Sequence, residues 1–263
     1  MTARIIAVAN QKGGVGKTTT TINLAASLAL ADRRVLLVDV DPQGNLTSGV
    51  GQKGKTATAG TIYEALTTVE PTTDAHPYLV PTGITGMSLI PADRNLTGAE
   101  IELVGLDGRE ERLRMFVSSM RSEYDHIFID CPPSLGLLTL NALVAADAVL
   151  IPLHCEYFAL EGLADLVGTM RRVRAALNPA LDIEGVLLTM FDERTNLGQQ
   201  VASDVRGFFK DKVFRTVIPR NVRLGEAPSH GMPVILYDVK SRGAEAYLAL
   251  AREVLERAAV TAA

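Results

Sequence analysis

The sequence predicts an α/β fold in which a doubly wound, mostly parallel sheet carries helices on both faces. Short apolar runs alternate with amphipathic stretches along nearly the whole chain, and this alternation is typical of βαβ units. The apolar runs are continuous, as expected of strands that are buried on both faces. A glycine-rich turn joins the first run to the first helical pattern. In such sheets ligands bind beyond the carboxyl ends of the strands, where this turn lies.

Six segments have the character of buried strands, and helical segments lie between them. We expect strands at residues 5–9, 35–38, 87–90, 126–129, 148–151 and 183–188. We expect helices after the glycine-rich turn and at residues 137–146, 161–177, 201–209 and 243–258. Residues 44–60, which contain five glycines, are interpreted as a mobile loop, and residues 218–231 as an irregular one. No linker or repeat interrupts the pattern, so residues 1–263 are expected to form a single domain.

The glycine-rich turn carries the strongest functional signal. It reads Lys12-Gly13-Gly14-Val15-Gly16-Lys17-Thr18-Thr19. A strand, a glycine-rich turn and a helix N-terminus direct backbone N–H groups and a positive dipole end at one point, which suits a nucleotide phosphate. In the P-loop pattern, Lys17 reaches the β- and γ-phosphates and the Thr18 hydroxyl binds Mg²⁺. Gln11 stands where that pattern has its first glycine, and a second lysine, Lys12, follows it.

Acidic residues close two of the predicted strands. Asp39 and Asp41 follow the second strand, where the two-residue period places them on the same side of the chain. A carboxylate there could orient or deprotonate water, and Asp39 is expected near the metal. Asp130 ends the fourth predicted strand, a pattern typical of the acid that holds Mg²⁺ either directly or through water.

Composition and charge narrow the class of protein. The 263 residues are 47% hydrophobic and 21% charged, as in an ordinary soluble globular protein. No run approaches the ~20 apolar residues of a membrane span, and the chain enters its first strand at once, so we expect a cytoplasmic protein with Cys131 and Cys155 as buried free thiols. The net charge of −4 argues against a uniformly basic nucleic-acid binder. Residues 194–242, however, hold nine Lys/Arg against four Asp/Glu, which is either a local phosphate-binding surface or a solvated face.

The two-lysine loop resembles the deviant Walker A P-loop of the ParA/MinD group of ATPases. The resemblance covers essentially the whole chain, and Asp-Cys-Pro-Pro-Ser-Leu-Gly at 130–136 and Ile-Pro-Arg-Asn at 218–221 point to the ParA/Soj partition branch. It implies an ATPase that uses ATP and Mg²⁺, forms an ATP-sandwich homodimer and binds double-stranded DNA without sequence preference. It further implies nucleoid association, a role in chromosome or plasmid partition, no membrane partner, and stimulation of hydrolysis by a ParB-type centromere-binding protein.

The same resemblance implies roles for individual residues. Lys12 would cross the dimer interface to the nucleotide of the other subunit, where a second cation offsets developing negative charge. Asp41 would lie near the attacking water, and Pro219 and Asn221 would border the adenine. Arg194 and Arg223 would contact DNA, with Lys240 and Arg242 as weaker candidates. The implied catalytic set is Lys12, Lys17, Asp41 and Asp130.

Three alternatives remain to be weighed. A MinD-like membrane ATPase would carry a basic amphipathic helix at its extreme C-terminus, but residues 258–263 contain no basic residue. An iron–sulfur reductase with the same loop requires paired cysteines, whereas Cys131 and Cys155 follow different strands. A nucleotide-binding scaffold without ATPase activity would not require the catalytic set of Lys12, Lys17, Asp41 and Asp130.

Overall fold

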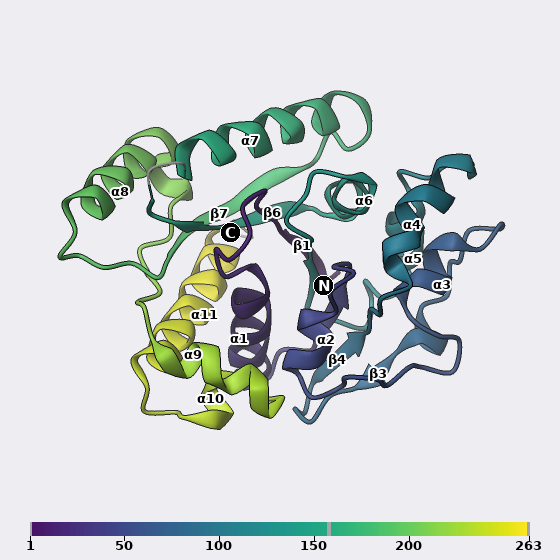
Figure 1. Ribbon diagram of the computed structural model, residues 1–263, viewed down its shortest axis with the longest axis horizontal. Helices are drawn as coiled ribbons and strands as arrows, with labels where there is room; N and C mark the ends of the chain where they lie inside the picture. Colours follow the sequence, from purple (N-terminus) through teal and green to yellow (C-terminus); the bar gives the residue numbers. More distant parts are fainter. Residues whose placement is uncertain (1, 157–158, 262–263) are drawn as a thin grey trace.

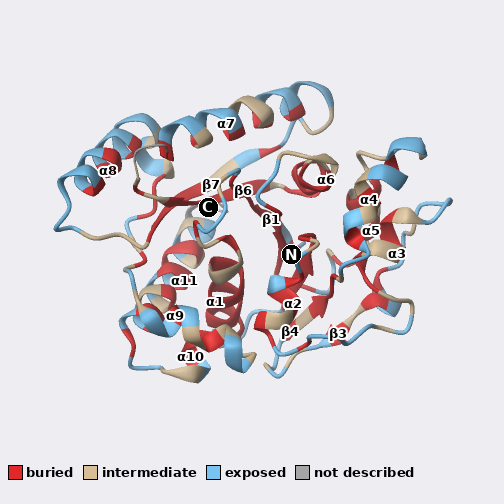
Figure 2. Ribbon diagram, viewed as in Figure 1, coloured by how far each residue is buried: buried red, intermediate tan, exposed pale blue. Residues whose placement is uncertain are grey.

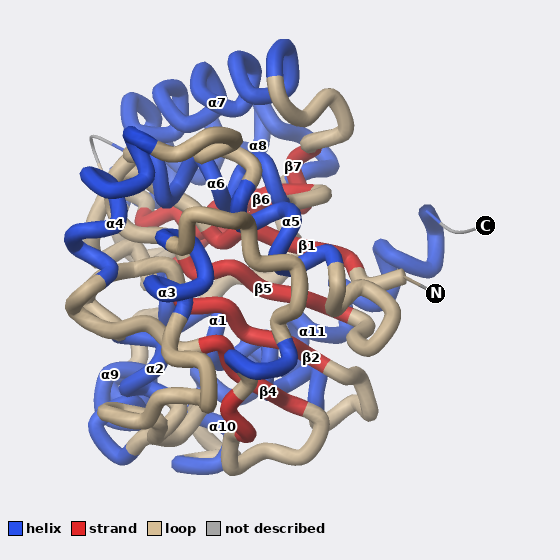
Figure 3. Tube along the Cα trace, turned by 90° about the vertical axis from the view of Figure 1, so that its right-hand side faces the viewer, coloured by secondary structure: helices blue, strands red, loops and turns tan. Residues whose placement is uncertain are grey.

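Seven strands form one sheet in the order β3-β4-β2-β5-β1-β6-β7 in the computed structural model, which describes residues 2–156 and 159–261 (Figure 3). Neighbouring strands are parallel except β3 and β4, which pair in antiparallel fashion. The doubly wound, mostly parallel α/β fold is therefore confirmed. The strands are β1 (Arg4–Val8), β2 (Val35–Asp39), β3 (Val80–Pro81), β4 (Met87–Ile90), β5 (His126–Asp130), β6 (Ala148–His154) and β7 (Asp182–Thr189).

The helices cover both faces of this sheet (Figure 1). They are α1 (Lys17–Ala29), α2 (Asn45–Gly49), α3 (Ile62–Thr67), α4 (Leu96–Glu102), α5 (Arg112–Ser118), α6 (Leu137–Ala145), α7 (Ala159–Ala176), α8 (Asn196–Phe209), α9 (Val222–Glu226), α10 (Val234–Tyr237) and α11 (Arg242–Thr261). The chain runs from β1 to β2 and β4 on one side and later to β6 and β7 on the other. A crevice is expected at such a reversal, beyond the carboxyl end of β1.

Two hydrophobic clusters form the core, one on each face of the sheet. Alternate residues of β1 enter different clusters: Ile5 and Ala7 pack with α3 to α8, while Ile6 and Val8 pack with α1, α2 and α9 to α11. This division follows from the two-residue period of a strand. Figure 2 shows α1 buried along almost its whole length, since α11 covers the side of α1 that the sheet leaves open. The helix that follows the glycine-rich turn is thus held rigidly inside the molecule.

Two segments that we predicted as loops contain helix, so those predictions were wrong. Residues 44–60 begin with α2, because Leu46 is fully buried and Thr47 bonds to Asp39 of β2. Residues 218–231 contain α9, whose N-terminus is capped by the Asn221 side chain and whose Leu224 packs into the second cluster. Both helices are only five residues long, so tertiary contacts rather than local propensity account for them.

The ends of the chain agree with the predicted strand and helix there. β1 begins at Arg4, and α11 extends the predicted last helix to Thr261. The last two residues of the C-terminal tail, 262 and 263, lie outside the described part of the chain. Within the described residues, no helix combines the length and the apolar character that crossing a membrane requires.

Candidate active site

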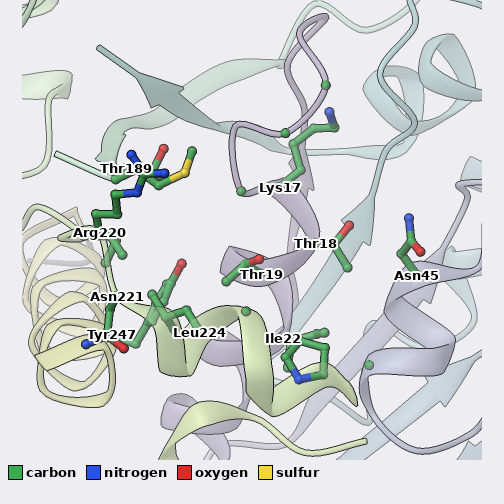
Figure 4. A pocket seen from close by; sticks show the side chains of 18 of the residues that line it. Lys17, Thr18, Thr19, Ile22, Asn45, Thr189, Arg220, Asn221, Leu224 and Tyr247 are labelled. Atoms are coloured by element: carbon green, nitrogen blue, oxygen red, sulfur yellow. The ribbon is translucent and has the colours of Figure 1, made fainter. Parts of the chain in front are cut away.

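A cavity of about 780 Å³ opens beyond the carboxyl ends of the strands, beside the N-terminus of α1. Its volume is within the usual range of small-molecule sites. Figure 4 shows Lys17, Thr18 and Thr19 on one side of the cavity and Arg220, Asn221 and Leu224 on the other. Of the residues that we predicted to contact ATP, the cavity is lined by Gly13, Gly14, Gly16, Lys17, Thr18, Thr19, Pro219 and Asn221.

The loop from β1 to α1 is shaped to receive an anion. Gly14 and Gly16 have φ angles of 74° and 88°, in the left-handed region where a side chain would strain the backbone. Gly16 is the N-cap of α1, and the first turn of α1 contains no acidic side chain. No carboxylate of that turn neutralises the positive end of the helix dipole. This end borders the cavity, because Lys17, Thr18 and Thr19 line it.

Lys17 is the buried cation of this cavity. Its Nζ donates to the carbonyl oxygen of Lys12 at 3.1 Å, and the residue is only 7% exposed. Burial lowers the pKa of Lys17, although the negative charge of Asp130 acts in the opposite direction. The bond to Lys12 uses one of the three donors of the ammonium group. A phosphate in the cavity would accept hydrogen bonds from the others.

Thr18 and Asp130 provide oxygen atoms of the kind that Mg²⁺ prefers. Asp130 ends β5, directly opposite Asp39 of β2. Its two carboxylate oxygens accept from the Thr18 hydroxyl at 2.7 Å and the Thr21 hydroxyl at 3.0 Å. Burial raises the pKa of Asp130, and the charge of Asp39 raises it further. A divalent cation beside Thr18, which lines the cavity, would offset the negative charge of Asp130. Asp130 itself is fully buried behind the lining, so its contact with the ion stays a prediction.

Asp39 is occupied mainly with holding α2. Its Oδ2 accepts from the backbone N–H of Thr47 at 2.8 Å and from the Thr47 hydroxyl at 2.7 Å, while Oδ1 accepts from the N–H of Asp41 at 3.2 Å. Burial raises the pKa of Asp39 to about 6. The residue lies behind the cavity lining, next to Asp130. Its contact with a metal stays a prediction.

Asp41 lies at the wall of the same cavity as Lys17 and Thr18. Only 6% of the residue is exposed, and its Oδ1 accepts from the N–H of Gln43 at 2.9 Å. A carboxylate fixed in this way can orient a water molecule that attacks a bound phosphate. The structure thus brings Asp41 to the cavity as predicted, and its catalytic role stays a prediction.

The wall opposite the phosphate loop combines α9 with the end of β7. Asn221 accepts from the N–H of Arg223 at 2.9 Å, which caps α9, and Pro219 forms a parallel bridge with Phe191. Thr189 ties this wall to the phosphate loop because its hydroxyl donates to the carbonyl oxygen of Val15 at 2.8 Å. Val15 itself does not line the cavity, so its predicted contact with ATP stays a prediction.

The sequence reasoning missed the contribution of β7. Thr189 and Met190 line the cavity, and Met190 has a φ of 48°, which is rare for a residue with a side chain. Asn45 and Ser48 of α2 also line it. The available signal was the position of Thr189 and Met190 at the carboxyl end of a predicted parallel strand, where ligands bind.

Lys12 differs from the other lysine of the loop, Lys17, because Lys12 does not line the cavity. Its backbone N–H donates to the Asn10 side chain at 3.0 Å, and its Nζ forms an ion pair with Glu156, which follows β6. The Lys12 side chain is 38% exposed. In this conformation the second lysine is partly exposed and held outside the cavity lining.

The predicted DNA-binding residues lie before α8, in α9, after α10 and at the start of α11, and none of them lines the cavity. Arg194 precedes α8, and its side chain is 88% exposed and paired with Asp192 at 2.7 Å. Arg223, in α9, pairs with Glu226 at 2.7 Å and with Asp238 at 3.3 Å. The backbone N–H of Lys240 donates to Asp238 at 3.2 Å, which places Lys240 beside Arg223, and Arg242 begins α11. The structure brings Arg223 and Lys240 together, and contact with DNA stays a prediction.

The two cysteines are both free and buried, as predicted. Burial raises the pKa of Cys155 to about 11 and also raises the pKa of Cys131. Thiols of this kind are protonated at neutral pH and are poor metal ligands. The environment of both residues thus gives no support to the iron–sulfur alternative.

Comparisons with known proteins agree with this geometry. The family described as an AAA domain matches residues 3–183. The chain is 60% identical to the chromosome partitioning protein ParA of Myxococcus xanthus, over 97% of this chain and 88% of that protein. It is 57% identical to the sporulation initiation inhibitor protein Soj of Bacillus subtilis, over 95% and 98%.

A solved structure is similar over nearly the same length. It is that of cobyrinic acid a,c-diamide synthase from Mycobacterium smegmatis with bound ATP analogue and magnesium. The two chains superpose with a TM-score of 0.81 at 40% identity, over 96% of this chain and 94% of the other.

Proposed function

Because this chain belongs to the ParA/Soj family of chromosome-partitioning ATPases, we propose that two copies of it enclose ATP between them and that the resulting dimer holds DNA until hydrolysis separates it. ATP and Mg²⁺ are the cofactors, as in the similar structure with an ATP analogue and magnesium. DNA binding is independent of sequence, and a ParB-type protein stimulates hydrolysis. The protein is then nucleoid-associated when it carries ATP.

The observation that carries this proposal is the orientation of the two lysines. Lys17 is buried in the cavity, whereas Lys12, five residues earlier, lies outside the cavity lining and pairs with Glu156. A lysine so close to a phosphate site yet outside it is suited to the nucleotide of a second subunit. Hydrolysis then requires two subunits, because one cation comes from each.

The cavity residues divide the work of binding and hydrolysis. Thr18 and Asp130 would hold Mg²⁺, which would neutralise charge on the phosphate oxygens. Backbone N–H groups of the loop and Lys17 bind the phosphates, and Pro219 and Asn221 border the base. Asp41 orients the attacking water and accepts its proton. Lys12 from the second subunit approaches the phosphates, where negative charge increases as the bond breaks.

DNA binding depends on the exposed arginines. A guanidinium group donates two parallel hydrogen bonds to a phosphate and keeps its charge at any physiological pH. Contacts to phosphate alone carry no sequence information. One subunit would bind weakly, but in a dimer the second set of arginines acts at high effective concentration. Dimerisation with ATP can therefore switch DNA binding without any change in Arg194 or Arg223.

A measurement of specific activity against protein concentration tests the proposal. A two-subunit site predicts that ATP turnover per chain rises with concentration until the dimer is saturated, in the presence of Mg²⁺ and a fixed amount of duplex DNA. Turnover per chain that stays constant from far below to far above the concentration of dimer formation would contradict the shared site.

A further inference from the structure

Glu156 forms an ion pair with Lys12, although neither residue lines the nucleotide cavity. One carboxylate oxygen of Glu156 forms the ion pair with Lys12 Nζ, and the other lies 3.0 Å from Nδ1 of His154. The hydrogen bond from Lys12 lowers the pKa of Glu156, and the charge of His154 adds to this effect. Glu156 is thus an ionised group that holds the second lysine of the loop by its charged end.

Both sides of this ion pair are fixed to neighbouring strands. Asn10, just after β1, accepts from the N–H of Lys12 and donates to the carbonyl oxygen of Pro152 in β6 at 2.7 Å. The N–H of Glu156 in turn donates to the carbonyl oxygen of His154, the last residue of β6, at 2.8 Å. The backbones around Lys12 and Glu156 are therefore set by the parallel pairing of β1 with β6.

The ion pair is exposed enough to be exchanged. The side chains of Lys12 and Glu156 are 38% and 47% exposed. Ion pairs of this kind contribute only about 0.2–1 kcal/mol, because water and salt screen them. A triphosphate carries more negative charge than one carboxylate, and it would hold the ammonium group in a water-poor interface. Phosphate would therefore displace Glu156 from Lys12.

We infer that Glu156 is a positioning residue that keeps Lys12 on its own subunit, directed away from its own cavity, until the nucleotide of a second subunit replaces the carboxylate. This inference rests on the proposed function of Lys12 across a dimer interface. Each subunit must break one Lys12–Glu156 pair when the dimer forms. The pair thus opposes dimerisation slightly and holds Lys12 outside the lining of its own cavity in the nucleotide-free chain.

Two measurements on Glu156→Gln test the inference, with Glu161→Gln as the matched control. Glu161 is an exposed residue of α7 whose replacement removes the same charge. The first measurement is pulse acetylation of the nucleotide-free protein, with the labelling of Lys12 followed by mass spectrometry. Loss of the ion pair should raise the labelling rate of Lys12 by roughly 1.4- to 5-fold, and Glu161→Gln should leave it unchanged.

The second measurement is the dissociation constant of the dimer with a non-hydrolysable ATP analogue, obtained by sedimentation. Two pairs are broken per dimer, so Glu156→Gln should lower this constant by roughly 2- to 25-fold. Unchanged labelling of Lys12 would show that the pair does not hold it in solution and would overturn the inference. Weaker dimerisation in Glu156→Gln than in Glu161→Gln would also overturn it, since Glu156 would then act within the dimer.

The same design separates this inference from the proposed function. A wild-type protein that stays monomeric at all concentrations of the analogue would refute the proposed function and the exchange with it. In that case the labelling of Lys12 would still report whether Glu156 holds the lysine in the single chain.

Discussion

The cavity and three cations outside its lining, Lys12, Arg194 and Arg223, which we call the rim, hold their charged side chains in different ways. Inside, Lys17 and Asp130 are at most 7% exposed and bond to the phosphate loop and the start of α1. On the rim, each cation is exposed and paired with a carboxylate of its own chain. The interior is fixed by burial and hydrogen bonds, whereas the rim pairs are weak and open to phosphate.

This difference separates two tasks. A buried polar group that loses its hydrogen-bond partner costs more free energy than an exposed group that does so. The buried side chains of the cavity are therefore held in one arrangement, as catalysis requires. The rim cations can exchange a carboxylate for a phosphate at little cost, which suits contacts that form and break in each cycle. Four sets of substitutions test how far the two regions are independent.

Replacement of Asp41 by alanine should have the largest effect. Removal of a positioned base typically lowers turnover by about 10²- to 10⁴-fold. We expect Asp41→Ala to bind ATP, dimerise and accumulate on DNA, measured by phosphate release and light scattering. Hydrolysis at the wild-type rate would remove Asp41 from the mechanism.

Replacement of Lys17 by alanine should abolish useful nucleotide binding. Hydrogen bonds to charged groups contribute about 1.5–3 kcal/mol each, so the loss of one or two should weaken ATP binding by roughly 10- to 10⁴-fold. Lys12→Ala should bind ATP as the wild type does yet lose dimerisation and turnover. Titration of both variants with a fluorescent ATP analogue gives the answer. If both variants lost ATP binding equally, Lys12 would act in its own cavity, and the distinction between interior and rim would fail for this residue.

Charge reversal of the two rim arginines should affect DNA binding alone. Arg194→Glu and Arg223→Glu should keep ATP binding and dimerisation but lose DNA binding, whereas Arg252→Glu, an exposed charge reversal on α11, should bind DNA much as the wild type does. The milder alanine variants should each show a salt dependence of log affinity that is shallower by about 0.9 per lost phosphate contact. If both glutamate variants bound DNA as tightly as the wild type, the excess of basic residues at 194–242 would be only a solvated face.

The smallest effect is expected for the buried hydrogen bond between α1 and α11, and it is an effect on the free energy of unfolding. The Thr20 hydroxyl lies 3.1 Å from the Tyr247 hydroxyl, and both residues are almost fully buried between α1 and α11. Tyr247→Phe leaves the Thr20 hydroxyl without this partner and should lower the free energy of unfolding by about 1 to 2 kcal/mol. Arg194→Ala, which breaks a rim pair, should change it by less than about 0.5 kcal/mol in the same urea titration. Equal losses would contradict the distinction between interior and rim.

The parts of the molecule that were predictable from sequence are those with a local signal. The strands that form the centre of the sheet are continuous apolar runs, and the loop at residues 12–19 is a contiguous motif. The helices α2 and α9 were not predicted because they depend on distant partners, such as Leu46 in the second cluster. Met190 was missed for a similar reason, since its place in the cavity follows from where β7 ends.

The carboxylate partners of the rim could not be predicted either. Glu156 lies 144 residues from Lys12 in sequence, and their contact exists only because β1 and β6 are neighbours. Asp192 is close to Arg194 in sequence, but nothing in the pattern of residues 192–194 distinguishes a paired arginine from a free one. Side-chain pairing of this kind follows from the fold and from local backbone geometry rather than from composition.

The most direct test of the account measures mass and DNA binding together on Asp41→Ala, with ATP and with ADP, at one salt concentration. Size-exclusion chromatography with light scattering, run with and without a duplex of arbitrary sequence, gives both quantities. The account predicts that the ATP form has the mass of two chains and retains the duplex, while the ADP form has the mass of one chain and does not. The contrary result is an ADP form that stays a single chain and retains the duplex as well as the ATP form does. That result would contradict the claim that the rim arginines bind DNA only when two chains pair.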